Sequence, residues 1–217
     1  MVAVPIGNSK DITYHAVETF QKVDIIACEH TGKFLDLKSR VGFDTRAVLM
    51  PYYSYNEVNS SDGLLKQLNE GKSIAMVTDA GTPRISDPGY HVVRKAHEQG
   101  IQVKAIPGAS AVAAGMSIAP IPLEPLLYLG FISPKPGRRD KTLSLYLDYQ
   151  GTVCFYESIH RLIKLLTAIH NIWGNVETFI VRELTKQHEE MFWGSIEETI
   201  VWAEKKRGEF IIFVHKK

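Results

Sequence analysis

The stretch Asp79-Ala80-Gly81-Thr82-Pro83-Arg84-Ile85-Ser86-Asp87-Pro88-Gly89 lies between a short apolar run at residues 73–77 and an amphipathic run at residues 90–99. The first run is typical of a buried strand, and the second has helical spacing and ends before Gly100. Glycines, prolines, carboxylates and hydroxyls are denser here than a plain surface turn requires. Because ligands of open α/β sheets gather at the carboxyl ends of strands, we expect this loop to contact a ligand. The alternative is an ordinary strand-to-helix connection, since glycine and proline are common in loops.

Composition excludes several classes of protein. The 217 residues carry 25 Lys and Arg against 24 Asp and Glu, so no global basic field favours nucleic acid, although a local patch is compatible with this balance. No apolar run reaches the ~18 residues of a membrane span and no signal-peptide pattern is present, so we expect a cytoplasmic protein. Cys28 and Cys154 lie in apolar runs typical of buried, reduced thiols. The histidines lack metal-ligand spacing, and no metal is predicted.

Strand-like runs alternate with helical patterns along the whole chain, which predicts an α/β protein with mainly parallel sheets covered on both faces. The expected strands are residues 2–4, 24–28, 47–50, 73–77, 102–106, 127–132, 152–156, 178–181 and 210–214. Asp11 is expected to cap a helix over residues 12–22, and Ser195 with Glu198 has capping-box spacing. Three prolines between residues 118 and 125 interrupt both kinds of element, so we expect domains at residues 1–119 and 120–217.

The loops at the strand ends suggest the kind of ligand. No Gly-x-Gly-x-x-Gly follows a strand and no P-loop is present, so phosphate cradling is not supported. Gly108-Ala109-Ser110 lacks the second glycine of a nucleophile elbow, which disfavours a serine hydrolase. A ligand with adenine, ribose and a zwitterionic tail suits these loops better.

Several motifs occur in order along nearly the whole chain. They are Pro5-Ile6-Gly7-Asn8, Asp11-Ile12-Thr13, Asp79 to Pro83, Ile85 to Gly89, Pro107-Gly108, Gly130-Phe131, Phe155 to Ser158 and Arg182 to Lys186. Together they resemble the ribosomal small-subunit methyltransferase I family of the tetrapyrrole methylase superfamily. The resemblance implies two α/β domains with S-adenosylmethionine in the cleft between them, and a homodimer. It also implies 2′-O-methylation of a cytidine ribose in small-subunit ribosomal RNA, in the free RNA or the 30S subunit.

Two loops depart from the family pattern. Residues 29–32 read Glu-His-Thr-Gly in place of Glu-Asp-Thr-Arg, and residues 53–57 read Tyr-Ser-Tyr-Asn-Glu in place of His-Glu-His-Asn-Glu. The changes leave open two alternatives to the ribosomal RNA enzyme. One is a carbon methyltransferase acting on a precorrin-type tetrapyrrole, and the other is a catalytically silent homologue that binds RNA or ribosomes.

Methyl transfer needs in-line positioning of the acceptor, and a ribose hydroxyl must also lose a proton. Glu29, Asp79 and Asp87 are therefore the candidate catalytic residues, although both aspartates could instead cap turns. Candidate cofactor-binding residues share a place in the motif loops. They are Pro5, Ile6, Gly7, Asp79, Gly81, Thr82, Pro83, Ile85, Gly108, Ala109, Ser110, Tyr156, Glu157, Arg182, Glu183 and Thr185.

Two further groups could contact RNA. Lys135, Arg138, Arg139 and Lys141 form a dense basic cluster in an expected loop over residues 133–140, where they could grip phosphates or simply form a solvated face. Tyr52, Tyr53 and Tyr55 could stack on an unpaired base. Tyr53 and Tyr55, at alternating positions, could instead pack beneath a loop. Glu157 and Arg182 could alternatively form a structural ion pair.

Overall fold

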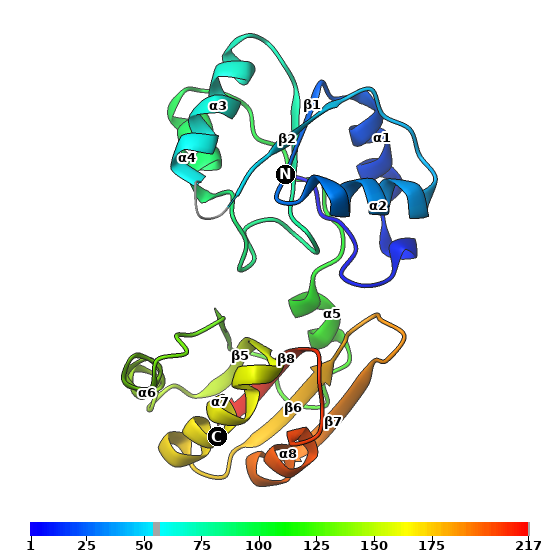
Figure 1. Cartoon of the computed structure of the whole chain (residues 1–217). Coiled ribbons are helices and arrows are strands. Elements are labelled where there is room, and N and C mark those ends of the chain that lie inside the picture. The colour runs from blue at the N-terminus through cyan, green and yellow to red at the C-terminus, as the bar shows by residue number, and fades with distance from the viewer. Residues whose placement is uncertain (54–56, 217) are drawn as a thin grey trace. The chain divides into compact units, whose positions relative to one another are not determined.

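The computed structural model describes residues 1–53 and 57–216, which divide into two compact units, Met1–Ser110 and Ala111–Lys217 (Figure 1). Both units are α/β, as expected. None of the described helices has the length and apolar character needed to cross a bilayer.

A three-stranded parallel sheet with the order β2-β1-β3 organises the first unit. Its elements are η1 (Ser9–Asp11), α1 (Tyr14–Lys22), β1 (Ile25–Cys28), α2 (Thr31–Val41), β2 (Val48–Pro51), α3 (Glu57–Asn69), β3 (Ile74–Val77) and α4 (Tyr90–Glu98). Alternate residues of β1 face opposite sides, because successive side chains of a strand point to opposite faces. Ile26 packs with Phe20 of α1 and Phe34 of α2, whereas Ala27 packs with Leu64 of α3 and Val92 of α4. Figure 1 shows these two helix pairs on opposite sides of the strands.

Three expected features of this unit differ in the structure. Residues 2–4 and 102–106 were predicted as strands, but they form only isolated bridges, Val2 with Ile106 and Val4 with Gly81. The N-cap of α1 is Thr13, whose hydroxyl accepts from Ala16 N at 3.0 Å, and Asp11 instead ends the short helix η1. A threonine hydroxyl accepts hydrogen bonds from the first free amides of a helix as well as an aspartate carboxylate does. The spacing of the residues alone therefore does not show which of Asp11 and Thr13 is the N-cap.

The second unit has a five-stranded mixed sheet with the order β4-β5-β8-β6-β7. Its elements are α5 (Ala111–Ser117), β4 (Leu126–Gly130), α6 (Pro136–Leu145), β5 (Gly151–Ser158), α7 (Ile159–Trp173), β6 (Glu177–Arg182), β7 (Glu190–Ser195), α8 (Ile196–Ala203) and β8 (Glu209–Lys216). β4 and β5 are parallel, but β8 inserts between β5 and β6 and runs antiparallel to both, and β7 is antiparallel to β6. The expectation of mainly parallel sheets is therefore wrong for this unit.

Both faces of this sheet are covered, and Val153 and Cys154 of β5 lie on opposite faces. Val153 packs with Leu162 and other residues of α7, whereas Cys154 packs on the face that carries Val112 of α5. A Cβ on Gly115 of α5 would come within 2.8 Å of the Phe213 ring. α5 therefore packs on the second sheet, which explains why the unit begins at Ala111 and not after residue 119.

Two elements of the second unit were not expected. The basic stretch predicted as a loop begins helix α6 at Pro136, because proline at the first helical position needs no amide hydrogen bond. β7 is an edge strand paired only with β6, and its sequence alternates partly buried and exposed residues. The capping box at Ser195 and Glu198 is confirmed at the start of α8.

Candidate active site

Three of the expected cofactor loops converge within the first unit. The backbones of Val4 and Gly81 exchange two hydrogen bonds of 2.9 and 3.0 Å, which join the loop after residue 4 to the loop after β3. The Thr82 hydroxyl donates to Ala109 O at 3.0 Å and brings the loop at residues 107–110 to the same place. A Cβ on Gly108 would come within 3.0 Å of Ala3 Cβ, so the close approach of these backbones favours glycine at this position.

The organising loop is held in an uncommon conformation. Two of its residues that are not glycine, Arg84 and Ser86, have positive φ of 75° and 63°. Such backbone costs free energy and persists where surrounding contacts impose it, as at many functional sites. Gly81 and Gly89, at the two ends of the strained segment, also have positive φ, of 75° and 126°.

Carboxylates from the ends of β1 and β3 meet because these strands are parallel neighbours. His30 Nδ1 lies 2.8 and 3.0 Å from the two Asp79 carboxylate oxygens. The Lys33 ammonium, on the first turn of α2, donates to Asp79 Oδ2 at 2.6 Å. Ligand atoms of Glu29, His30 and Asp79 all lie within 4.8 Å of one another, a spacing compatible with a metal ion. The Lys33 ammonium already neutralises the Asp79 oxygen that such an ion would use, which makes the set a poor cation site.

Asp87 belongs to the same electrostatic group. Burial raises the pKa of Asp87 to about 6, the negative charges of Glu29 and Asp79 add to this rise, and a hydrogen bond from Thr78 opposes it. A carboxyl group with a pKa near neutrality is suited to accept and release a proton. All three candidate catalytic carboxylates of the sequence analysis are thus brought together.

Glu57 supports the loop, although it was not singled out as a candidate from the sequence. Its Oε1 accepts hydrogen bonds from Gly89 N at 2.9 Å, His91 N at 3.0 Å and the Tyr52 hydroxyl at 3.2 Å. Burial alone would raise the pKa of Glu57, but the backbone hydrogen bonds from His91 and Gly89 hold it below its usual value. A carboxylate at the N-terminus of α4 also interacts favourably with the helix dipole. Glu57 therefore fixes the end of the organising loop from a different helix.

The expected tyrosine cluster is divided by the structure. Tyr52 is only 1% exposed and bonds to Ser61 Oγ at 2.9 Å, so the interpretation as a base-stacking residue is wrong for it. Tyr53 lies with its ring 6.3 Å from that of His30. Tyr55 lies outside the described residues.

A hollow of about 190 Å³ opens beside the carboxylates. It is lined by Pro5, Ile6 and Gly7 of the first cofactor loop, and by His30 and Asp79, among other residues. Pockets that enclose a drug-sized ligand are larger, about 300–1,000 Å³. This hollow by itself accommodates only part of a nucleoside-containing ligand.

In the second unit, Tyr156 and Glu157 at the end of β5 have structural partners. The Tyr156 ring lies 5.5 Å from the ring of Tyr128, and burial raises the pKa of its hydroxyl. Glu157 is 3% exposed and accepts from Arg161 Nε at 2.7 Å and Nη2 at 3.0 Å. The alternative of an ion pair between Glu157 and Arg182 is not what forms, because Arg161, one turn into α7, pairs with this carboxylate.

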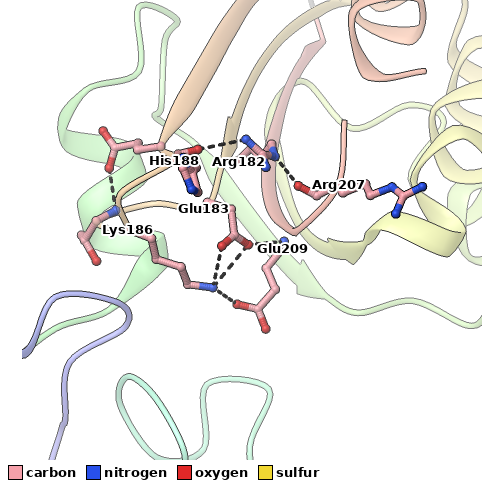
Figure 2. A network of polar contacts seen from close by, with 8 residues as sticks. Arg182, Glu183, Lys186, His188, Arg207 and Glu209 are labelled. Atoms are coloured by element: carbon pink, nitrogen blue, oxygen red, sulfur yellow. Dashed lines mark hydrogen bonds and ion pairs between the residues drawn. The ribbon is translucent and has the colours of Figure 1, made fainter. Parts of the chain in front are cut away.

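Arg182 begins a polar network at the turn after β6 (Figure 2). It donates to the backbone carbonyls of Arg207 and His188. Glu183 accepts from Glu209 N at 2.8 Å and pairs with Lys186 at 3.3 Å, while Lys186 also reaches Glu209 at 2.6 Å. Burial alone would raise the pKa of Glu183, but the Glu209 amide and the charge of Lys186 lower it. The network holds the turn in a fixed shape.

Thr185, in the middle of this turn, has an unused polar group. Its φ is 66°, and its amide donates to Glu189 at 2.5 Å. Its hydroxyl is buried and has no hydrogen-bond partner within the described part of the chain. A buried hydroxyl without a partner costs free energy, so it points to a ligand that completes it.

Comparison with known proteins identifies the family. The profile of the Tetrapyrrole (Corrin/Porphyrin) Methylases matches residues 1–200. Ribosomal RNA small subunit methyltransferase I of Leptospira biflexa is 37% identical over 219 residues, covering 100% of this chain and 90% of the relative. The protein of the same name from Escherichia coli O157:H7 is 39% identical, covering 99% of this chain and 76% of the relative. The chain belongs to the ribosomal RNA small subunit methyltransferase I family of tetrapyrrole methylases.

Solved structures of other tetrapyrrole methylases share the fold. The methyltransferase CobJ superposes with a TM-score of 0.73 at 15% identity, covering 99% of this chain and 92% of that chain. Uroporphyrin-III C-methyltransferase from Thermus thermophilus gives a TM-score of 0.68 at 16% identity, covering 99% and 92%. The two-unit α/β architecture expected from the sequence is thereby confirmed.

S-adenosylmethionine is the methyl donor of this family of enzymes, and the chain's own groups fit such a molecule. Its adenine and hydroxyls need hydrogen-bond partners, and the buried Thr185 hydroxyl is one group with a free hydrogen-bonding position. Its sulfonium carries a positive charge, which the carboxylates near Asp79 would favour.

The loop at residues 29–32 differs from the family pattern at two positions, and the structure shows the contacts that the residues here make. The family's arginine is replaced by Gly32, but Lys33 supplies a cation to Asp79 one residue later. The family's aspartate is replaced by His30, whose ring contacts the same carboxylate. The loop therefore places charged groups around Asp79 although its residues differ from the family pattern.

The predicted RNA-binding cluster lies at the start of α6. Lys135 is the N-cap residue, and Lys135, Arg138 and Lys141 are exposed. Arg139 differs, because its side chain is 13% exposed and pairs with Asp140 at 3.0 Å. Three of the four basic side chains are thus available to phosphates.

Proposed function

We propose that this protein transfers a methyl group from S-adenosylmethionine to the 2′-hydroxyl of a cytidine ribose in small-subunit ribosomal RNA. The observation that carries the proposal is the full-length match, at 37–39% identity, to proteins named for this RNA. CobJ and the uroporphyrin-III C-methyltransferase from Thermus thermophilus, at 15% and 16% identity, share only the fold with this chain. The protein acts in the cytoplasm on ribosomal RNA or the 30S subunit, as a homodimer.

The bound cofactor supplies an electrophilic methyl group on sulfur, and the chain positions the acceptor and removes its proton. We assign to Asp87 the role of the general base that accepts the proton of the ribose hydroxyl. Its pKa of about 6 leaves it mostly ionised at neutral pH and still able to hold a proton. Asp79 is engaged by Lys33 and His30, so its role is to hold this arrangement and not to exchange protons.

We assign the residues that could recognise the cofactor within each unit separately. In the first unit the candidates are the backbones at residues 5–7, 81–83 and 108–110, with Ile85 beside them. In the second unit we assign recognition to Thr185, whose hydroxyl has an open hydrogen-bonding position. Arg182 and Glu183 hold the turn that presents it, and Glu157 with Tyr156 lies at the end of β5, which β8 separates from β6.

Transfer of labelled methyl groups to 30S subunits that lack the modification tests the proposal. Nuclease digestion and mass spectrometry should then find 2′-O-methylcytidine in the RNA. Asp87→Asn serves as the matched inactive variant, and it also separates an active enzyme from a silent ribosome-binding homologue. Tight cofactor binding without transfer to any ribosomal RNA would contradict the proposal, and a methylated precorrin-type substrate would replace it.

A further inference from the structure

Phe131 is an exposed aromatic residue at the end of β4. The strand ends at Gly130, which has a φ of 59°, and the next residue turns outward with 54% of its surface exposed. The Phe131 ring has neighbours on its inner side. The Tyr156 ring lies 5.5 Å away, and Arg161 Cζ lies 6.0 Å from the ring centre. One part of the ring is therefore supported while the rest faces solvent.

The support beneath Phe131 is fixed by hydrogen bonds. Arg161 of α7 forms a two-bond pair with the buried Glu157, at 2.7 and 3.0 Å. It also donates to Ile132 O at 3.0 Å, so it holds the backbone directly after Phe131. Bidentate pairs of this kind fix geometry as well as charge. The ring is held in place before any partner arrives, which lowers the entropic cost of binding.

Positive charge follows directly along the chain. Lys135 is the N-cap residue of α6, and Arg138 and Lys141 are exposed on its first turns. Proteins that bind single-stranded nucleic acid combine such charges with aromatic rings on which bases stack. The charges match a phosphate backbone, and the flat ring matches an unpaired base.

We infer that Phe131 stacks on an unpaired base of the RNA substrate while Lys135, Arg138 and Lys141 contact adjacent phosphates. The inference rests on the proposed function and adds to it a base-contacting residue on the second unit. Arg161 acts as the positioning residue beneath the ring. Other occupants, such as the cofactor's adenine, are separated from RNA by the experiment below.

The experiment measures binding of a short fluorescein-labelled single-stranded RNA over a series of salt concentrations. Phe131→Leu keeps apolar bulk but removes the aromatic face, and should weaken binding on the order of tenfold at every salt concentration. Phe131→Tyr keeps the face and should bind as the unaltered protein does. Trp193→Leu, at a residue with a similar exposure of 56%, is the matched control and should bind normally.

The basic residues should give a different response. Replacing Lys135, Arg138 and Lys141 by Gln should lower the steepness of the salt dependence by roughly 0.7 for each phosphate that the protein no longer neutralises. Phe131→Leu should leave that steepness unchanged, because stacking releases no counterions. The same RNA in a duplex should be insensitive to Phe131→Leu, since its bases are already stacked.

Several results would overturn the inference. The first is normal RNA affinity of Phe131→Leu. The second is an equal loss of RNA affinity in Trp193→Leu. The third is a Phe131→Leu variant that binds S-adenosylhomocysteine more weakly while its RNA affinity is unchanged. Methyl transfer to 30S subunits by the unaltered protein is measured separately, so that the stacking role and the proposed function can fail independently. Transfer with no effect of Phe131→Leu on RNA binding or rate rejects the stacking role alone. RNA binding through Phe131 without any transfer rejects the proposed function alone.

Discussion

The Lys33 ammonium lies 2.6 Å from Asp79 Oδ2, on the carboxylate whose oxygens also contact the His30 ring. Lys33 follows directly after Gly32, where the family pattern has arginine. The contact places a cation on Asp79 in a loop whose residue types differ from the family pattern. It also distinguishes the two carboxylates, because Asp79 pairs with a cation while Asp87 is half-buried and has a raised pKa.

Removing the Lys33 charge should raise the pKa of Asp87, because the negative charge of Asp79 would then lack its cation. In Lys33→Met, the uncompensated charge of Asp79 should move the rising limb of the pH–rate profile to higher pH. Lys33→Arg should restore it. Because Lys33 is 62% exposed, the melting temperature should change little. Lys22→Met, which breaks an exposed pair with Glu18, is the control. An unshifted profile in Lys33→Met would show that Asp79 does not influence the titrating group.

Asp87 should set the pH dependence of methyl transfer. Single-turnover rates should rise with pH around a midpoint of about 6, where the carboxyl ionises. Asp87→Asn should lower the rate by about 10²–10⁴-fold and abolish this rise, since an amide cannot accept the proton. A normal rate in Asp87→Asn would assign proton removal to another group or to water.

The same carboxyl should affect stability with a predictable sign. Its folded pKa lies above the ordinary value of 3.8, so its contribution to stability is fully present below pH 3.8 and is lost as pH rises through about 6. Asp87→Asn should therefore stabilise the fold more at pH 8 than at pH 4, by on the order of 2 kcal/mol. Asp44→Asn, at a fully exposed residue, should show no such difference. Thermal melts at both pH values measure the effect, and equal gains would contradict it.

Glu57→Ala should loosen the organising loop. It leaves the amides of Gly89 and His91 without their acceptor, at a cost of about 1–3 kcal/mol of unfolding free energy. Glu98→Ala removes only an exposed pair with Arg94 and should cost less than about 1 kcal/mol. Denaturant unfolding compares the two variants. Faster amide exchange at Gly89 and His91 in Glu57→Ala would locate the loosening, and equal stabilities would refute this role.

Thr185→Val tests the unpartnered hydroxyl. Valine keeps the shape, so the fold should be as stable as before or slightly more stable, because no protein hydrogen bond is removed. Binding of S-adenosylhomocysteine should weaken by about 2- to 13-fold, which corresponds to one hydrogen bond of 0.5–1.5 kcal/mol. Thr142→Val, which removes a bond to Arg138 O within α6, is the calorimetric control. Unchanged affinity in Thr185→Val would remove Thr185 from the cofactor site.

Much of the fold could be predicted from local patterns. The buried runs that became β1 and β3, the Gly-rich loop between β3 and α4, and the Ser195 capping box all depend on residues close in sequence. β7 and the antiparallel position of β8 could not be predicted, because pairing between distant strands leaves no local periodicity that sets direction. The basic stretch was misread for a related reason, since Pro136 is compatible with both a loop and a helix start.

The motif residues alone determined the family, the alternation of strands and helices, and the set of candidate loops, because these depend on residue types at short spacings. The tertiary structure decided which charges meet. Lys33 and Asp79 are 46 residues apart and come together only because β1 and β3 are parallel neighbours. Glu57 of α3 accepts a hydrogen bond at the N-terminus of α4. Arg161, and not Arg182, pairs with Glu157. Electrostatic partners depend on distance in space, which no single stretch of sequence specifies.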